Sequence, residues 1–101
     1  MSDKKIIFMG TPLIAANYLN SLINNKYKVV SVFTQPPRKR NRGMKVQSSP
    51  VHELANHNNI KVNFPTRLDE EAFDLIKSYK PDLIIVMAYG LLIPAKILNF
   101  P

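Results

Sequence analysis

The sequence contains no cysteine and few acidic residues, 7 in comparison with 14 lysines and arginines. Without cysteine the chain can form no disulfide framework, no thiolate zinc site and no cysteine nucleophile. Long hydrophobic runs are absent near the N-terminus, where only four apolar residues, Ile6 to Met9, follow Lys5. Four residues are too few for a signal peptide or a membrane span. We therefore expect a soluble, cytoplasmic protein without a membrane partner.

Glycine is also scarce, at 3 residues. Gly10 follows the first apolar run, as in a nucleotide-binding turn, but a dinucleotide fingerprint would need further glycines where Pro12 and Ala15 stand. It would also need an acid near the end of the second apolar run, where Thr34 and Gln35 stand instead. The sequence thus excludes this dinucleotide motif.

The chain has 101 residues, of which 46% are hydrophobic. This length is below that of a typical single domain, and the apolar content is too high for intrinsic disorder. We expect residues 1–101 to form one small unit with a thin core and no second domain.

Positive charge is concentrated in one segment, residues 35–48, which we expect to be a loop. No acid lies between Thr34 and Val51. Two interpretations of this basic loop stay open from charge alone: a solvated surface segment, or a site for anions such as nucleic acid. Its basic residues are Arg38, Lys39, Arg40, Arg42 and Lys45.

Strand-like and helix-like segments alternate along the chain. Short apolar runs predict strands at 6–9, 29–33 and 83–87, with a brief further strand at 61–63. Helical spacing predicts helices over about 15–23, from Ser49 to about His57, and from Asp69 to the residues before Pro81. This alternation favours an α/β fold with a mostly parallel sheet, strand order 3-2-1-4 and helices on both faces.

The predicted strand order changes direction between the first and the fourth strand. Ligands of such folds bind beyond the carboxyl ends of the strands at this switch point. The crevice should therefore lie between residues 10–12 and 88–90. From spacing alone, both segments can equally be turns without a ligand, with Thr11 capping the helix and Pro12 in its first turn.

Catalytic side chains give little signal. His52 and His57 are five residues apart in one helical pattern, so they do not share a face as metal ligands would, and we expect exposed or capping roles for them. Ser48 and Ser49 precede Pro50 and resemble helix caps. We assign no catalytic residue and no metal site in this chain.

Five motifs in register resemble the methionyl-tRNA formyltransferase family. They cover essentially the whole chain. They are Ile7-Phe8-Met9-Gly10-Thr11-Pro12, Val32-Phe33-Thr34-Gln35-Pro36, Arg42-Gly43 with Lys45, Ser49-Pro50-Val51, and Val86-Met87-Ala88-Tyr89-Gly90-Leu91 with Pro94.

The resemblance implies a Rossmann-like formyltransferase domain and transfer of a formyl group from 10-formyltetrahydrofolate to methionyl initiator tRNA, without a metal. It implies that the basic loop meets the acceptor arm of the tRNA, with Arg42 matching the motif best, and that the full-length enzyme is a monomer. The implied folate crevice consists of Gly10, Thr11, Pro12, Met87, Ala88, Tyr89, Gly90 and Leu91.

The sequence departs from the family pattern in two places. In the loop, Pro37 precedes Arg38, and Lys39-Arg40-Asn41 replace the usual Pro-Ala-Gly-like stretch. The family's catalytic Asn-x-His motif, Ser-Leu-Leu-Pro stretch and later aspartate do not occur, so the chain resembles an incomplete N-terminal portion of the domain that is inactive alone. Two alternatives stay open: a standalone RNA-binding module, and a formyltransferase relative acting on a sugar amine.

Overall fold

The computed structural model describes residues 3–40 and 45–101, with only the backbone of residues 39, 40 and 45. Four strands form one parallel sheet: β1 (Lys5–Gly10), β2 (Lys28–Phe33), β5 (Lys61–Asn63) and β6 (Leu83–Met87). Their order is β5-β2-β1-β6, which is 3-2-1-4 in the chain order of these four strands. The predicted α/β class and topology are confirmed.

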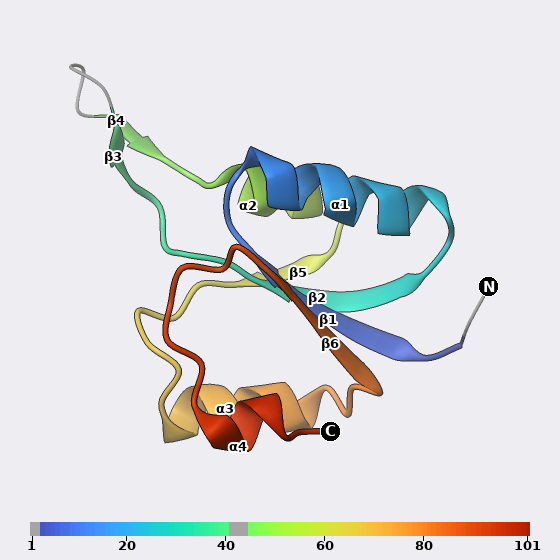
Figure 1. The fold of residues 1–101 in the computed structure, drawn as a ribbon. Helices are drawn as coiled ribbons and strands as arrows, with labels where there is room; N and C mark the ends of the chain where they lie inside the picture. The colour runs from blue at the N-terminus through green and yellow to red at the C-terminus, as the bar shows by residue number, and fades with distance from the viewer. Residues whose placement is uncertain (1–2, 41–44) are drawn as a thin grey trace.

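Helices cover both faces of this sheet, as Figure 1 shows. Helices α1 (Leu13–Asn24) and α2 (Pro50–His57) lie on one face, and α3 (Glu70–Ser78) and α4 (Ala95–Leu98) lie on the other. The four-residue helix α4 follows Pro94 and is too short for the sequence periodicity to have revealed it.

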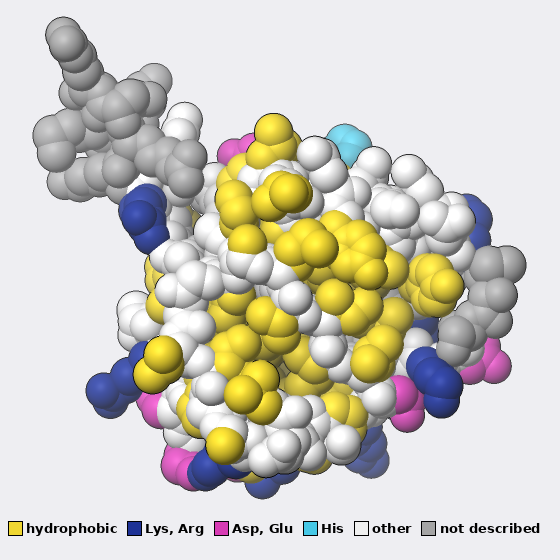
Figure 2. Space-filling model, viewed as in Figure 1, with side chains coloured by type: hydrophobic (Ala, Val, Ile, Leu, Met, Phe, Trp, Pro, Cys, Tyr) yellow, Lys and Arg dark blue, Asp and Glu magenta, His cyan; other side chains and the backbone are white. Residues whose placement is uncertain are grey.

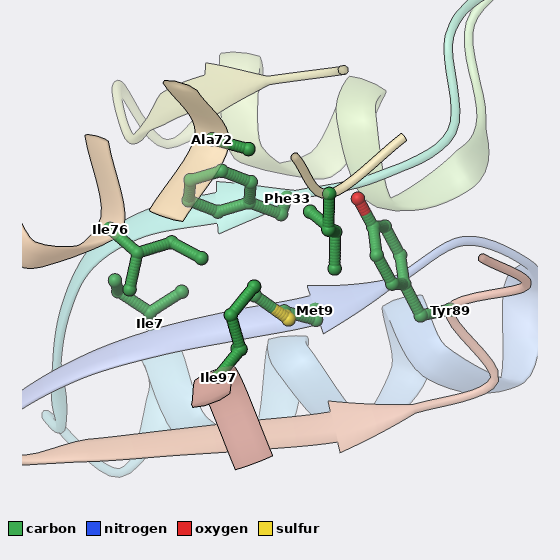
Figure 3. Packing of buried hydrophobic residues seen from close by; sticks show 8 residues of the cluster. Ile7, Met9, Phe33, Ala72, Ile76, Tyr89 and Ile97 are labelled. Atoms are coloured by element: carbon green, nitrogen blue, oxygen red, sulfur yellow. The ribbon is translucent and has the colours of Figure 1, made fainter. Parts of the chain in front are cut away.

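The central strand β1 supplies both layers of the core because successive side chains of a strand point to opposite faces. Phe8 packs with the apolar side of α1 and α2, whereas Ile7 and Met9 pack with α3, α4 and Phe33 (Figure 3). All four of these side chains are fully buried. An unbroken apolar run is therefore what this doubly covered strand requires.

Polar residues fix the starts of α2 and α3 as the sequence predicts. Ser49 Oγ accepts the N–H of His52 at 3.1 Å, and Pro50 occupies the first turn. Asp69 Oδ1 accepts the N–H of Ala72 at 3.0 Å. These side chains satisfy N–H groups that have no partner within the helix.

The basic segment 35–48 is not simply a loop, which corrects the sequence-based expectation. Strands β3 (Arg38–Arg40) and β4 (Lys45–Gln47) pair in an antiparallel hairpin that extends away from the body of the domain (Figure 1). Each strand has three residues and lacks alternating apolar side chains, so the strand period is invisible in the sequence. Arg42 lies outside the described residues.

Strand β6 is an outer strand of the described sheet, and its surroundings are apolar. Figure 2 shows hydrophobic side chains gathered over the face on which α1 and β6 lie. Leu83 and Val86 of β6 are 46% and 44% exposed. In the part of the chain that the structure describes, no helix has the length and hydrophobicity needed to cross a bilayer.

Candidate active-site crevice

A cavity of about 280 Å³ lies where the carboxyl ends of β1, β2 and β6 meet the foot of the basic hairpin. Parallel strands place all their carboxyl ends at one edge of the sheet, and the loops from this edge form the walls. The cavity is lined by Thr11, Pro12, Gln35, Pro36, Arg38, Gln47, Ser49 and Ala88.

The turns after β1 and β6 are in direct contact. Gly10 pairs with Met87 at the end of the two strands, and Thr11 Oγ1 donates a hydrogen bond of 2.7 Å to the carbonyl oxygen of Tyr89. A Cβ at residue 10 would lie 2.7 Å from the Cβ of Ala15 and 2.8 Å from the carbonyl oxygen of Met87. Glycine is required here because these atoms leave no room for a side chain.

Thr11 does not cap α1, contrary to the sequence-based expectation. Pro12 is the N-cap residue of this helix, and no side chain of the described residues caps it. The hydroxyl of Thr11 is used across the crevice instead, because it donates to Tyr89 and accepts the N–H of Gln35 at 3.3 Å. This side chain therefore links three strand ends rather than starting a helix.

A chain of hydroxyl groups connects α2 with the turn after β6. Thr34 and Ser49 are buried, and their oxygens are 2.6 Å apart. Thr34 Oγ1 also lies 3.5 Å from Thr11 Oγ1, and Thr11 donates to the carbonyl oxygen of Tyr89. The three hydroxyl groups thus connect the start of α2 with the carbonyl oxygen of Tyr89.

Gln35 connects the basic hairpin to the turn after β6. Its Nε2 donates to the Tyr89 carbonyl at 3.1 Å, and its Oε1 accepts a hydrogen bond from the guanidinium of Arg38. Gly90, with a φ of 96°, makes room for this contact, since a Cβ there would collide with Gln35 Nε2. The amide of Gln35 therefore fixes where the hairpin leaves the sheet.

The side chain of Tyr89 points away from the cavity and into the core. It is 2% exposed and packs with Met9, Phe33 and Ile97 (Figure 3). Its hydroxyl is buried and has no hydrogen-bond partner among the described residues. Burial raises the pKa of Tyr89 from 10.0 to about 12 because the ionised phenolate would lose its hydration.

We expect Tyr89→Phe to keep or raise the free energy of unfolding by up to about 1 kcal/mol, because it removes an unpaired buried hydroxyl. The raised pKa also makes stability depend on pH. The folded state holds the Tyr89 proton more tightly than the unfolded state, so this contribution is present below pH 10 and lost between pH 10 and about 12. Urea unfolding across this pH range should show that the Phe variant loses less free energy of unfolding than the wild type.

Tyr27→Phe is the matched control, because Tyr27 is 43% exposed. This variant should lose stability above pH 10 as the wild type does. If wild type and Tyr89→Phe lose the same free energy of unfolding above pH 10, the effect does not come from Tyr89.

The predicted folate-crevice residues lie near one another, but they differ in their position relative to the cavity. Thr11, Pro12 and Ala88 line the cavity, Gly10 and Tyr89 are buried beside it, and Gly90 is exposed. Met87 and Leu91 are half-buried, and each packs against one of the two core layers.

The predicted RNA-binding residues are only partly described. Arg38 lines the cavity and is exposed. The backbones of Lys39, Arg40 and Lys45 belong to the hairpin, of which Arg38 and Gln47 line the crevice. Arg42 lies outside the described part of the chain.

Pro36 and Gln47 of the cavity lining were not recognised from the sequence as site residues, and neither were the hydrogen-bonding residues Thr34, Gln35 and Ser49. Thr34, Gln35 and Ser49 each make a side-chain contact with a segment far away in the sequence. The signal that could have revealed them is their place at the carboxyl end of β2, next to the switch point, and at the start of the following helix.

His52 is buried, which corrects the expectation of an exposed or capping side chain. It is 9% exposed, and its ring stacks on that of Phe64, with ring centroids 5.3 Å apart. His57 is exposed as expected. The sequence spacing could not show that a residue beyond the helix covers His52.

The cavity is equipped to bind rather than to transfer protons. Its described lining supplies amides, hydroxyls and one guanidinium, but no carboxylate or imidazole. Across the residues that the structure describes, no group of three or more His, Asp or Glu side chains could hold a metal ion. The arrangement suits a polar, uncharged or anionic ligand group held by hydrogen bonds.

The parallel sheet, its crossovers and the crevice at the switch point define a Rossmann-like α/β domain. The formyl transferase family model matches residues 4–101, so the chain belongs to this family.

Curated relatives extend this finding. The chain is 50% identical over 96 residues to a methionyl-tRNA formyltransferase of Rickettsia bellii, covering 94% of the chain and 32% of that protein. It is 47% identical over 95 residues to that of Thermosipho africanus, covering 94% and 31%, and 47% identical over 98 residues to that of Clostridioides difficile, covering 96% and 32%. The chain thus spans about a third of the length of these relatives.

Proposed function

We propose that the chain is part of an enzyme that transfers a formyl group from 10-formyltetrahydrofolate to the amino group of methionine on initiator tRNA. The observation that carries this proposal is the polar crevice at the switch point, with the basic hairpin at its mouth, in a chain of the formyl transferase family. Relatives named methionyl-tRNA formyltransferase support the tRNA substrate. Translation initiation places this activity in the cytoplasm, and we propose a monomeric enzyme.

In this reaction the amine nitrogen attacks the formyl carbon, and a new C–N bond forms. The bond between the formyl carbon and N10 of the folate breaks, the amine loses one proton, and N10 gains one. In our proposal the turn formed by Thr11, Tyr89 and Gly90 holds the folate side of the crevice, while the hairpin positions the tRNA. Backbone groups suit the first role because the hydroxyl chain and Gln35 fix the turn before a ligand binds.

We further propose that the groups that transfer the proton and stabilise the oxyanion come from the remaining two thirds of the enzyme. The described lining of the crevice contains no carboxylate or imidazole that could transfer the proton. The 101-residue chain alone should accordingly give no turnover above a control without protein.

Formyl transfer tests the proposal directly, with methionyl-tRNA and 10-formyltetrahydrofolate as substrates. The assay compares the 101-residue chain with the longest product that its gene encodes beyond Pro101. We expect turnover only with the longer product. Turnover by the short chain would contradict the assignment of the catalytic groups, and a longer product that formylates a sugar amine instead of the tRNA would overturn the substrate.

Arg42 is the basic residue with the best motif match, and we propose that it contacts the acceptor arm of the tRNA. In the longer product, Arg42→Ala should lower kcat/KM for tRNA roughly 5- to 150-fold, because one charge-assisted contact is lost. This factor corresponds to about 1 to 3 kcal/mol of binding free energy in the transition state. Folate affinity and Tm should stay unchanged. Steady-state kinetics over a salt series measures the effect.

Lys28→Ala is the matched control, because it removes the same charge at the start of β2, at the opposite edge of the sheet. If Arg42→Ala and Lys28→Ala change the tRNA kinetics equally, the basic hairpin acts only as a solubilising surface.

A further inference from the structure

An aromatic pair lies on the outer side of α2, next to strand β5. The rings of His52 and Phe64 stack at 24°, with centroids 5.3 Å apart. His52 is buried, whereas Phe64 is 46% exposed. Because the imidazole covers one face of Phe64 and nearly half of the side chain is accessible, the phenyl ring presents a flat apolar surface to the solvent.

This surface borders an open cavity of about 490 Å³. Lys61 is the charged residue of the described lining, which contains no acid. The other polar groups are those of two asparagines and of His52, whose Nδ1 has no partner among the described residues. The lining residues are His52, Asn56, Asn59, Ile60, Lys61, Val62 and Phe64.

The aromatic pair is connected to the crevice through the backbone. Phe64 follows the last residue of β5, whose carbonyl oxygen accepts the N–H of Thr34 at 3.0 Å. On the other side, the N–H of His52 donates to Ser49 Oγ, a member of the hydroxyl chain. Both rings thus lie at the carboxyl edge of the sheet, where the chain leaves for the basic hairpin.

An exposed aromatic ring beside positive charge is the combination that binds unpaired nucleotides. Bases stack on the ring face, and lysine or arginine attracts the phosphates. A double-stranded segment cannot offer a base face for such stacking, because its bases are stacked on one another. We propose that Phe64, supported by His52, stacks an unpaired base of the RNA substrate while Lys61 contacts its backbone.

This inference rests on the proposed RNA substrate, but its test does not need formyl transfer. The chain contains no tryptophan. A Phe64→Trp variant therefore carries a single indole whose fluorescence reports on the stacking position. Oligoadenylate of about eight nucleotides, within the usual site size of single-strand binders, should quench this emission.

Two controls separate stacking from charge. Inorganic polyphosphate should bind the basic surface without quenching, since it has no bases. Tyr27→Trp, at another exposed aromatic position, should not be quenched by oligoadenylate. A labelled oligonucleotide then measures affinity: Phe64→Leu should bind about tenfold more weakly than wild type, whereas Phe64→Tyr should bind equally, because only an aromatic ring preserves stacking.

The outcomes distinguish this site from the function on which it rests. Unchanged Phe64→Trp emission at saturating oligoadenylate, or equal quenching by polyphosphate, would overturn the stacking site even if the longer product formylates tRNA. Affinity of Phe64→Leu equal to that of wild type would do the same. Specific quenching in a protein without formyl transfer would support the site and overturn the proposed function.

Discussion

Gly10→Ala is expected to lower the free energy of unfolding by about 1 to 3 kcal/mol, the usual range for inserting an atom into a packed site. The added Cβ would lie 2.8 Å from the backbone oxygen of Met87 and 2.7 Å from the Cβ of Ala15. Neither atom belongs to a flexible side chain, so the end of the β1–β6 pairing must shift. Urea unfolding monitored by circular dichroism measures this loss.

A second substitution tests the cause. In the double variant Gly10→Ala with Ala15→Gly, one of the close contacts is absent. The two single variants together should therefore lose more free energy of unfolding than the double variant does. Ala15→Gly alone should cost about 1 kcal/mol, as glycine does within a helix. A Gly10→Ala variant within about 0.5 kcal/mol of wild type would show that the strand end adapts freely.

Ser49→Ala should destabilise the chain by about 2 to 3 kcal/mol, because the serine has two functions. Its Oγ caps α2 through the N–H of His52, and its hydroxyl is bonded to the buried Thr34. Losing a cap costs about 1 kcal/mol, and leaving a buried hydroxyl with a weaker partner costs about as much or more. Thermal and urea unfolding both measure the effect.

Ser48→Ala is the matched control, since it removes the neighbouring hydroxyl, which does not cap α2. The double variant Thr34→Val with Ser49→Ala should be less destabilised than the sum of the single changes, because it leaves no orphaned hydroxyl at this contact. Additive losses would mean that the bond between Thr34 and Ser49 contributes nothing beyond the cap.

The fold could be predicted where local pattern and tertiary packing agree. The apolar run of β1 is unbroken because both faces of this strand are covered. Ser49 and Asp69 accept local hydrogen bonds from the first N–H groups of their helices. The β3–β4 hairpin could not be predicted, since its charged three-residue strands are held by backbone pairing without an apolar face.

The position of the crevice followed from topology, but its internal contacts did not. Strand order alone places residues 10–12 beside 88–90. The contacts of Gln35 with Tyr89, across 54 residues, and of Thr34 with Thr11, across 23, depend on how the strand ends are set against one another. His52 was misjudged for the same reason, because the ring that covers it comes from the segment after β5.

The strictly parallel sheet also determines when β1 can be paired on both sides during synthesis of the chain. No two neighbouring strands of this sheet are joined by a tight turn. One edge of β1 stays unpaired until β6 is present, and at the start of this pairing Asp82 accepts the N–H of Lys5 across 77 residues. Such distant pairings form slowly because much chain entropy is lost before they gain contacts. A nascent chain on the ribosome therefore carries its most buried strand, β1, paired on one side only until β6 has left the exit tunnel, and during this interval chaperones have an apolar strand to bind.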